Sequence, residues 1–92
     1  MTDMSHVDLE LTYRDGLPRL GYLYLSEDPN DKSAHSRRVE PAMVIDLDRE
    51  GKLIGIELLA PSQVTLQAIN GILAEYGMEP LKKSDLAPLL AA

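Results

Sequence analysis

The feature that most constrains the fold is the stretch from residue 42 to residue 62, AMVIDLDREGKLIGIELLAPS. Two apolar runs flank a short acidic segment that ends at Gly51. Glycine enters the left-handed backbone region without the steric cost that other residues have, so the segment from Asp48 to Gly51 predicts a tight turn. We therefore expect an antiparallel hairpin with strands at residues 39–47 and 53–60.

The predicted turn also sets which residues face each other. We expect Val44 to face Ile56 and Ala42 to face Leu58, although a slip of one residue would exchange the two sides of the sheet. The opposite side would then also be apolar, which predicts a homo-oligomer, most simply a twofold dimer. The expected interface residues are Met43, Ile45, Leu47 and Leu53, together with Tyr22 and Tyr24 of the preceding strand.

Two further strands precede this hairpin. Residues 7–13 alternate apolar and polar side chains, which is typical of a strand with one solvated face. Residues 20–26, LGYLYLS, form a second apolar run, and Asp15-Gly16 between the two runs indicates a turn. The polar segment 27–38 that follows is interpreted as a mobile loop.

One main helix follows the predicted sheet. Apolar residues recur at steps of three and four between positions 62 and 76, as on one face of a helix. We expect Ser62 to cap its first turn and Gly77 to end it. Gly71 inside the helix suggests close packing against the sheet. A short helical segment is expected at residues 85–90, with this leucine-rich tail docked on the core or on a partner.

The predicted architecture is an α+β fold. It consists of a four-stranded antiparallel meander sheet packed by the main helix, plus the short C-terminal helical segment. Because 92 residues leave no room for a second core, we expect a single domain over 1–92, with sheet 6–60, helix 62–76 and tail 78–92.

Composition excludes several functional classes. The absence of cysteine removes disulfides, thiolate nucleophiles and cysteine-ligated zinc, and it agrees with a cytoplasmic protein. A formal charge of -6 disfavours nucleic-acid binding but permits a basic protein partner. The opening residues do not resemble an export signal, and no apolar run is long enough to suggest a membrane span.

The acidic turn is the strongest candidate for a metal site. Asp46, Asp48 and Glu50 alternate before Gly51, and Glu57 falls where a calcium loop would need its last carboxylate. Strand geometry would carry Glu57 away from the turn, however, which favours a solvated hairpin. We therefore expect no metal and no cofactor, and we keep divalent-metal or small-molecule binding as the alternative.

Catalytic groups are sparse in the sequence. His6 and His35 lie in polar segments without a carboxylate partner at a recognisable spacing. Ser62 lacks a neighbouring histidine and a Gly-x-Ser-x-Gly motif, so helix capping explains it. We predict no catalytic residues and a protein that is not an enzyme.

One family resemblance emerges from this stretch. The pattern of this stretch resembles the small prokaryotic domain of unknown function 2283. The residues that carry the resemblance are Val44-Ile45-Asp46, Asp48, Gly51, Gly55-Ile56-Glu57-Leu58-Leu59 and Ser62, with Leu23-Tyr24-Leu25 upstream. The chain departs from the family pattern at Gly21, where an acidic residue is usual, and at the inserted Pro61. The resemblance implies a small meander sheet with a packed helix, no established activity, and an association with toxin-like partners.

The expected function is therefore a non-enzymatic protein-interaction module. It would act as an antitoxin-like or regulatory partner of a basic protein, because the chain is acidic and lacks a recognisable catalytic constellation.

Overall fold

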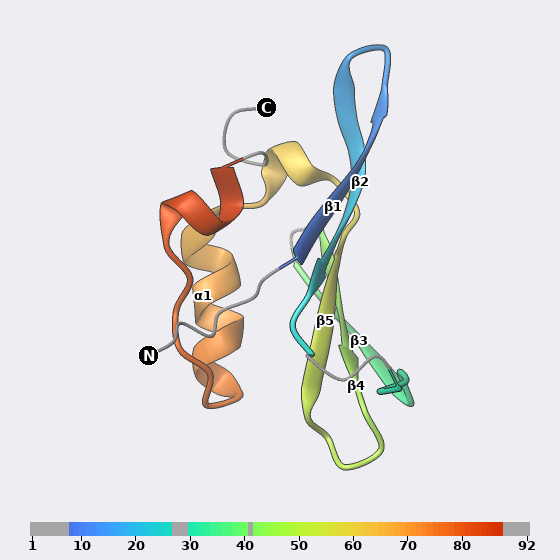
Figure 1. The fold of residues 1–92 in the computed structure, drawn as a ribbon, viewed down its shortest axis with the longest axis vertical. Helices are drawn as coiled ribbons and strands as arrows, with labels where there is room; N and C mark the ends of the chain where they lie inside the picture. Colours follow the sequence, from blue (N-terminus) through green and yellow to red (C-terminus); the bar gives the residue numbers. More distant parts are fainter. Residues whose placement is uncertain (1–7, 27–29, 41, 88–92) are drawn as a thin grey trace.

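The computed structural model describes residues 8–26, 30–40 and 42–87, which form one sheet and a helical layer on one of its faces (Figure 1). The strands are β1 (Asp8–Arg14), β2 (Leu17–Tyr24), β3 (His35–Val39), β4 (Met43–Leu47) and β5 (Leu53–Leu58). The helices are the 3-10 turn η1 (Pro61–Gln63), the α-helix α1 (Leu66–Glu75) and the 3-10 turn η2 (Lys83–Leu86). The predicted α+β class with an antiparallel sheet and one main helix is confirmed.

The sheet has five strands, in the order β1-β2-β5-β4-β3, and every neighbouring pair is antiparallel. The predicted four-stranded meander is therefore wrong in strand number and in topology. After β2 the chain crosses to the far edge, forms β3, β4 and β5 in succession, and returns beside β2. This arrangement is a Greek key, in which three hairpin-connected strands pair with a strand joined to them by a long connection.

Strand β3, except for Val39, lies in the segment 27–38 that was predicted as a loop. Its residues, HSRRV, are exposed except for Val39, so no apolar alternation identifies them as a strand. An edge strand is held by backbone hydrogen bonds to one neighbour, and these bonds do not require apolar side chains. A turn at residue 40 separates β3 from β4, so the predicted strand 39–47 is divided in two.

The turn between β4 and β5 forms as predicted. Gly51 has a φ of 86°, and its amide donates to the Asp48 carbonyl at 3.0 Å. Leu47 pairs with Leu53 next to the turn, as expected, but the register shifts beyond Asp46. Ile54 is an extra residue on β5, and the bulge it makes re-aligns the rest of the ladder.

This shift corrects the predicted facing residues. Ile45 pairs with Ile56, and Met43 pairs with Leu58, whereas Val44 pairs with Glu57. Ile56 and Leu58 of β5 consequently join Met43 and Ile45 of β4 on one face, under the helical layer, while Val44 lies on the opposite face beside Glu57.

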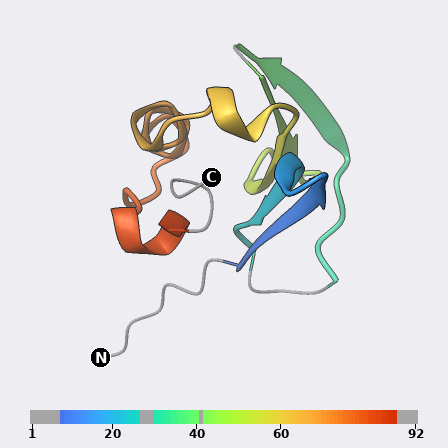
Figure 2. The ribbon, with the colours of Figure 1, turned by 90° about the horizontal axis from the view of Figure 1, so that it is seen from above.

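The core lies between that face and the helical layer (Figure 2). Its buried residues are Leu23, Met43, Ile45, Leu53, Ile56 and Leu58 from the sheet, and Val64, Ile69, Ile72, Leu73 and Leu86 from the helical segments. Truncating one such leucine or isoleucine to alanine typically costs about 2 to 5 kcal/mol. The apolar face that was predicted to contact a second subunit is therefore buried in the core.

Helix α1 begins later than predicted. The side chain of Thr65, rather than Ser62, caps it by accepting from the Ala68 amide at 3.1 Å. Ser62 instead lies in η1, which starts at a proline that cannot donate a backbone hydrogen bond. The predicted helix 62–76 is thus a 3-10 turn followed by a shorter α-helix.

The end of α1 confirms the predicted cap at Gly77. Its φ is 72°, and its amide donates to the Ala74 carbonyl at 3.2 Å, while the Met78 amide donates to the Leu73 carbonyl at 2.9 Å. These two bonds are the Schellman pattern. Gly71, by contrast, is exposed and would have nothing within 4 Å of an added Cβ atom, so the close packing expected there is absent.

The segment after α1 is docked onto the helix. Asn70 holds the backbone of Leu81 in both directions: its side-chain amide donates to the Leu81 carbonyl at 3.1 Å, and its carbonyl accepts from the Leu81 amide at 2.7 Å. Leu86, in η2, is fully buried in the core. The predicted docking is confirmed up to this residue. Helical structure begins at Lys83, before the predicted start at residue 85, and residues 88–90 of the predicted segment lie outside the described residues.

Candidate functional site

The face of the sheet that lies away from α1 carries a polar and aromatic surface, which we call the open face. Strand alternation places on it Asp8, Glu10 and Thr12 of β1, Leu20, Tyr22 and Tyr24 of β2, Gly55 and Glu57 of β5, Val44 and Asp46 of β4, and Ser36 and Arg38 of β3. The helical layer does not cover this face (Figure 2). The open face is therefore the part of the sheet that remains available to a ligand or partner.

Two tyrosines form the aromatic part of the open face. The ring centroids of Tyr22 and Tyr24 are 4.7 Å apart, with an interplanar angle of 63°. This edge-to-face geometry is favoured by the ring quadrupoles. Tyr24 is 41% exposed, so its ring presents apolar area to solvent while the Tyr22 ring lies flatter against the sheet.

Tyr22 reaches across a whole strand. Its hydroxyl donates to the Oδ2 atom of Asp46 at 2.7 Å, although β5 lies between the two residues. The ring passes over Gly55, where an added Cβ atom would lie 2.0 Å from the Tyr22 hydroxyl. Only glycine at position 55 lets the ring occupy this place.

Asp46 joins three strands through its two oxygens. Oδ2 accepts from Tyr22 of β2, and Oδ1 accepts from the Ser36 hydroxyl of β3 at 2.9 Å. Hydrogen bonds to an ionised acceptor are stronger than neutral ones, and they hold both donors in place. The open face is consequently a fixed surface around Asp46.

The tyrosines of this face stay protonated at neutral pH. Burial and the hydrogen bond to Asp46 raise the pKa of Tyr22 well above its ordinary value. The hydrogen bond from Tyr24 to Glu10, with an oxygen–oxygen distance of 2.8 Å, raises the pKa of Tyr24. Because a raised pKa disfavours the phenolate, both side chains act as hydrogen-bond donors and not as bases.

A shallow hollow of about 190 Å³ lies on the open face between β1, β2 and β5. It is lined by Glu10, Thr12, Leu20, Gly21, Tyr22 and Glu57. The carboxylates of Glu10 and Glu57 therefore border a space with an aromatic ring and a leucine on its walls. Such a lining suits a cationic group on an apolar stem, such as a lysine or arginine side chain.

The candidate metal ligands Asp46, Asp48 and Glu50 do not converge in the structure. Asp48 is 8% exposed, and its Oδ1 atom accepts from the amides of Glu50 and Lys52 at 2.9 and 2.8 Å. Asp46 is held in the Tyr22 network, and Glu50 is exposed at the turn. Among residues 8–26, 30–40 and 42–87, no three His, Cys, Asp or Glu side chains are grouped to hold a metal ion.

A second hollow, of about 280 Å³, lies beside the β4–β5 turn. Its lining comprises Asn30, Asp31, Lys32, Asp48, Arg49 and Glu50. The Nζ atom of Lys52 lies 3.8 Å from the Oδ2 atom of Asp31, at its border. Positive side chains thus accompany the carboxylates here, which weakens any attraction for a metal cation.

The residues predicted at a subunit interface separate into two groups. Met43, Ile45 and Leu53 are at most 1% exposed and lie in the core, because α1 covers the face of the sheet that they share with Ile56 and Leu58. Leu47 is half-buried against the same core. Tyr22 and Tyr24 lie on the open face.

Of the two histidines considered as catalytic groups, His35 is exposed on β3, and His6 lies outside the described residues.

The Tyr22–Gly55–Asp46 arrangement falls in a segment that a known family shares. Residues 21–62 match the family Protein of unknown function (DUF2283). The resemblance to this family is confirmed over that segment, which is less than half of the chain. DUF2283 carries no assigned activity in its description, but its matched segment contains all three residues of the arrangement and Glu57. Strand β1, with Glu10, lies outside the match.

No curated protein and no solved structure matches the chain significantly. Within the part of the chain that the structure describes, no helix is long and apolar enough to cross a membrane.

Sequence reasoning missed the contact between Tyr22 and Gly55. A glycine inside a strand signals the close approach of another group, and Gly55 in the β5 pattern was such a signal. The identity of the approaching group could not be read, because Tyr22 and Gly55 meet only once β2 pairs with β5.

Proposed function

We propose that this chain is a non-enzymatic protein-interaction module and that its open face binds a basic protein partner. The observation that carries the proposal is the hollow between Glu10 and Glu57, with Tyr22 and Leu20 on its walls. It combines two carboxylates with apolar area on a part of the sheet that the protein's own helix leaves uncovered.

Rigidity supports binding over catalysis. Asp46 holds Tyr22 and Ser36 through 2.7 and 2.9 Å hydrogen bonds, and Tyr24 is held by Glu10. A preorganised surface loses little side-chain entropy when it binds, whereas a general base needs a free lone pair near a substrate. Tyrosines that present ring area and a hydroxyl group are also enriched in protein interfaces.

Charge supports a basic partner. Asp8, Glu10, Asp46 and Glu57 lie on the open face, where they outnumber the two arginines Arg14 and Arg38, and Arg38 is paired with Glu40 at 3.4 Å. The whole chain carries a formal charge of -6, which adds long-range attraction for a cationic surface. Binding would regulate or neutralise the partner, as in an antitoxin-like role. The complex would form in the cytoplasm.

Affinity capture from the native cells, analysed by intact-mass spectrometry, tests the proposal. The wild-type chain should retain a basic protein in a fixed molar ratio. The double variant Glu10→Gln/Glu57→Gln should lose it, because both carboxylates of the hollow are neutralised. Raising the ionic strength should weaken the complex, since exposed charge pairs are screened by salt.

The matched control is Glu75→Gln/Glu79→Gln, which removes two carboxylates on and after α1. Equal loss of the partner in both double variants would assign the binding to net charge and would contradict a site on the open face. A captured protein that is acidic, or no stoichiometric protein at all, would refute the proposal.

A further inference from the structure

The sheet has two edges, formed by β1 and β3. Each edge strand pairs with a neighbour on one side only, so its other side presents backbone N–H and C=O groups that can pair with another strand. Proteins commonly protect such edges with charges that would repel an added strand. The two edges of this sheet differ in that protection.

Strand β3 is protected against pairing with a second copy of itself. An antiparallel pair centred on Arg37 would place this residue opposite Arg37 of the second copy, and like charges that face each other destabilise a ladder. The Arg37 guanidinium is also occupied, because it donates to Glu75 at 3.2 Å and to the Tyr76 hydroxyl at 3.1 Å.

Strand β1 has the opposite property, because its seven residues, DLELTYR, are complementary to themselves. An antiparallel pair centred on Leu11 places Asp8 opposite Arg14 of a second copy, and Leu9 opposite its Tyr13. Glu10 then faces Thr12, and Leu11 faces Leu11. Charged ends attract, and apolar residues meet on the core side of the sheet, as stable cross-strand pairs require.

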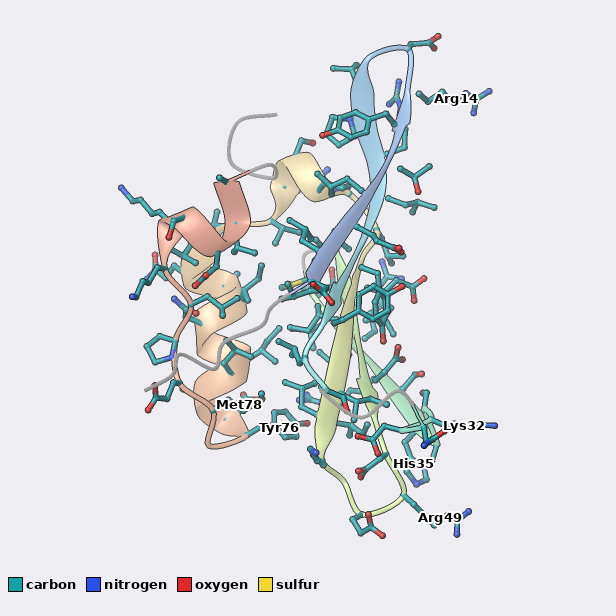
Figure 3. The ribbon with its side chains drawn as sticks, in the orientation of Figure 1. Arg14, Lys32, His35, Arg49, Tyr76 and Met78 are labelled. Atoms are coloured by element: carbon teal, nitrogen blue, oxygen red, sulfur yellow. The ribbon has the colours of Figure 1, made fainter. Side chains whose placement is uncertain are left out.

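The exposure of this strand agrees with an added neighbour. Tyr13 is 54% exposed near the end of the β1–β2 hairpin, which extends beyond the rest of the sheet (Figure 1). Arg14 points away from the body of the protein, and its side chain takes part in no ion pair among the described residues (Figure 3). In the antiparallel pair this projecting end lies beside the body of the second copy, where Leu9 covers Tyr13.

We infer that two copies of this chain associate through their β1 edges, in antiparallel register centred on Leu11, to form one continuous sheet with twofold symmetry. The contact is isologous, so each attractive pair occurs twice. It uses the backbone edge of β1 and requires no other protein, so this inference does not depend on the proposed basic partner.

Charge reversal tests both the contact and its register. Sedimentation velocity of the wild type should show a reversible monomer–dimer equilibrium. Arg14→Asp should weaken the dimer by roughly tenfold or more, because two attractive cross-strand pairs become repulsive. The swapped variant Asp8→Arg/Arg14→Asp should recover the wild-type dimer, since it restores both pairs with the signs exchanged.

Arg49→Asp is the matched control, because it makes the same charge change at the exposed β4–β5 turn, at the opposite end of the sheet from Arg14 (Figure 3). It should leave the dimer unchanged. A monomeric wild type, equal weakening by both arginine variants, or a swapped variant no better than Arg14→Asp would each overturn the inference.

A thiol cross-link gives an independent reading of the register. The chain contains no cysteine, so Leu11→Cys introduces a single thiol. Residues directly opposite in an antiparallel pair have Cα atoms about 4.5 to 5.5 Å apart, which is within disulfide range. Under mild oxidation Leu11→Cys should form a covalent dimer, whereas Arg38→Cys on β3 should not. Equal cross-linking of the two variants would contradict the assigned edge, and circular dichroism would show that each is folded.

Discussion

The hydroxyl of Tyr22 on β2 donates to the carboxylate of Asp46 on β4 at 2.7 Å, across the intervening strand β5. The bond is part-buried, and it exists because Gly55 on β5 leaves room for the tyrosine ring. It ties together two strands that do not pair with each other. One glycine thus determines where the ring of Tyr22 lies on the open face.

Removing the Tyr22 hydroxyl should therefore lower stability. Tyr22→Phe removes a hydrogen bond to a charged acceptor, and we expect a loss of about 1 to 2 kcal/mol in the free energy of unfolding. Urea denaturation followed by circular dichroism measures it. Tyr24→Phe is the control, because its bond to Glu10 is exposed and should contribute less. Equal losses in the two variants would contradict a structural role for the Asp46 bond.

Gly55→Ala should destabilise the protein through Tyr22. The added methyl group would lie 2.0 Å from the Tyr22 hydroxyl, so the ring must move and the bond to Asp46 breaks. We expect a loss of about 1 to 3 kcal/mol from the displaced ring and its lost bond. In the Tyr22→Ala background the same change should cost less, because the ring is absent. A double-mutant cycle with purely additive losses would show that the two residues do not interact.

Gly71→Ala should stabilise the protein by about 0.5 to 1 kcal/mol, because alanine loses less backbone entropy in a helix. The site is exposed, and nothing lies within 4 Å of the added methyl group. Gly77→Ala is the informative contrast: at a φ of 72° alanine is strained, so this variant should be less stable than the wild type. Thermal unfolding measures both. Unfolding of the Gly71→Ala variant at a lower temperature than the wild type would refute the first expectation.

Calcium, magnesium and manganese should leave the melting temperature unchanged. A cation that binds the folded state must raise its stability in proportion to the logarithm of its concentration. Asp48 already accepts two backbone amides at 2.9 and 2.8 Å, and Asp46 already accepts two hydroxyl groups. A concentration-dependent rise that Asp48→Asn abolishes would instead support a metal site at the turn.

Stability should decrease at alkaline pH, in part through Tyr22. Its pKa is raised in the folded state from an ordinary value of 10.0, so above about pH 10 the unfolded chain loses this proton while the folded protein retains it. The unfolded state then binds fewer protons, and the free energy of unfolding falls as pH rises. Tyr22→Phe should show a smaller decrease between about pH 9 and about pH 11 than the wild type. Parallel pH profiles would exclude this linkage.

Local features of the chain could be predicted from the sequence, without knowledge of the tertiary structure. The turn at Gly51 and the helix end at Gly77 were predicted correctly, because a positive φ is a property of single residues. The apolar stretches of β2, β4 and β5 were also predicted at the right positions, because the apolar pattern of a strand is visible in consecutive residues.

Tertiary structure decided what depends on distant partners. Strand β3 has no apolar pattern and exists only because β4 offers it backbone hydrogen bonds. The bulge at Ile54 shifted the register by one residue, so Ile56 and Leu58 pair with Ile45 and Met43 on one face. The helical layer covers this face, and Met43 and Ile45 therefore lie in the core and not at an interface. Thr65 replaced Ser62 as the helix cap, because the chain first forms a 3-10 turn at Pro61.

On the open face, too, some features could be predicted from the sequence and others depend on the tertiary structure. Its carboxylates and tyrosines are evident in the sequence, but their arrangement is not. Tyr22, Gly55 and Asp46 come together because β5 returns between β2 and β4, so their contacts span up to 33 positions along the chain. Sequence alone determined which groups this protein can present. The Greek-key pairing of the strands decided which of them meet, because side chains so far apart in sequence are brought together only by the sheet that the backbone completes.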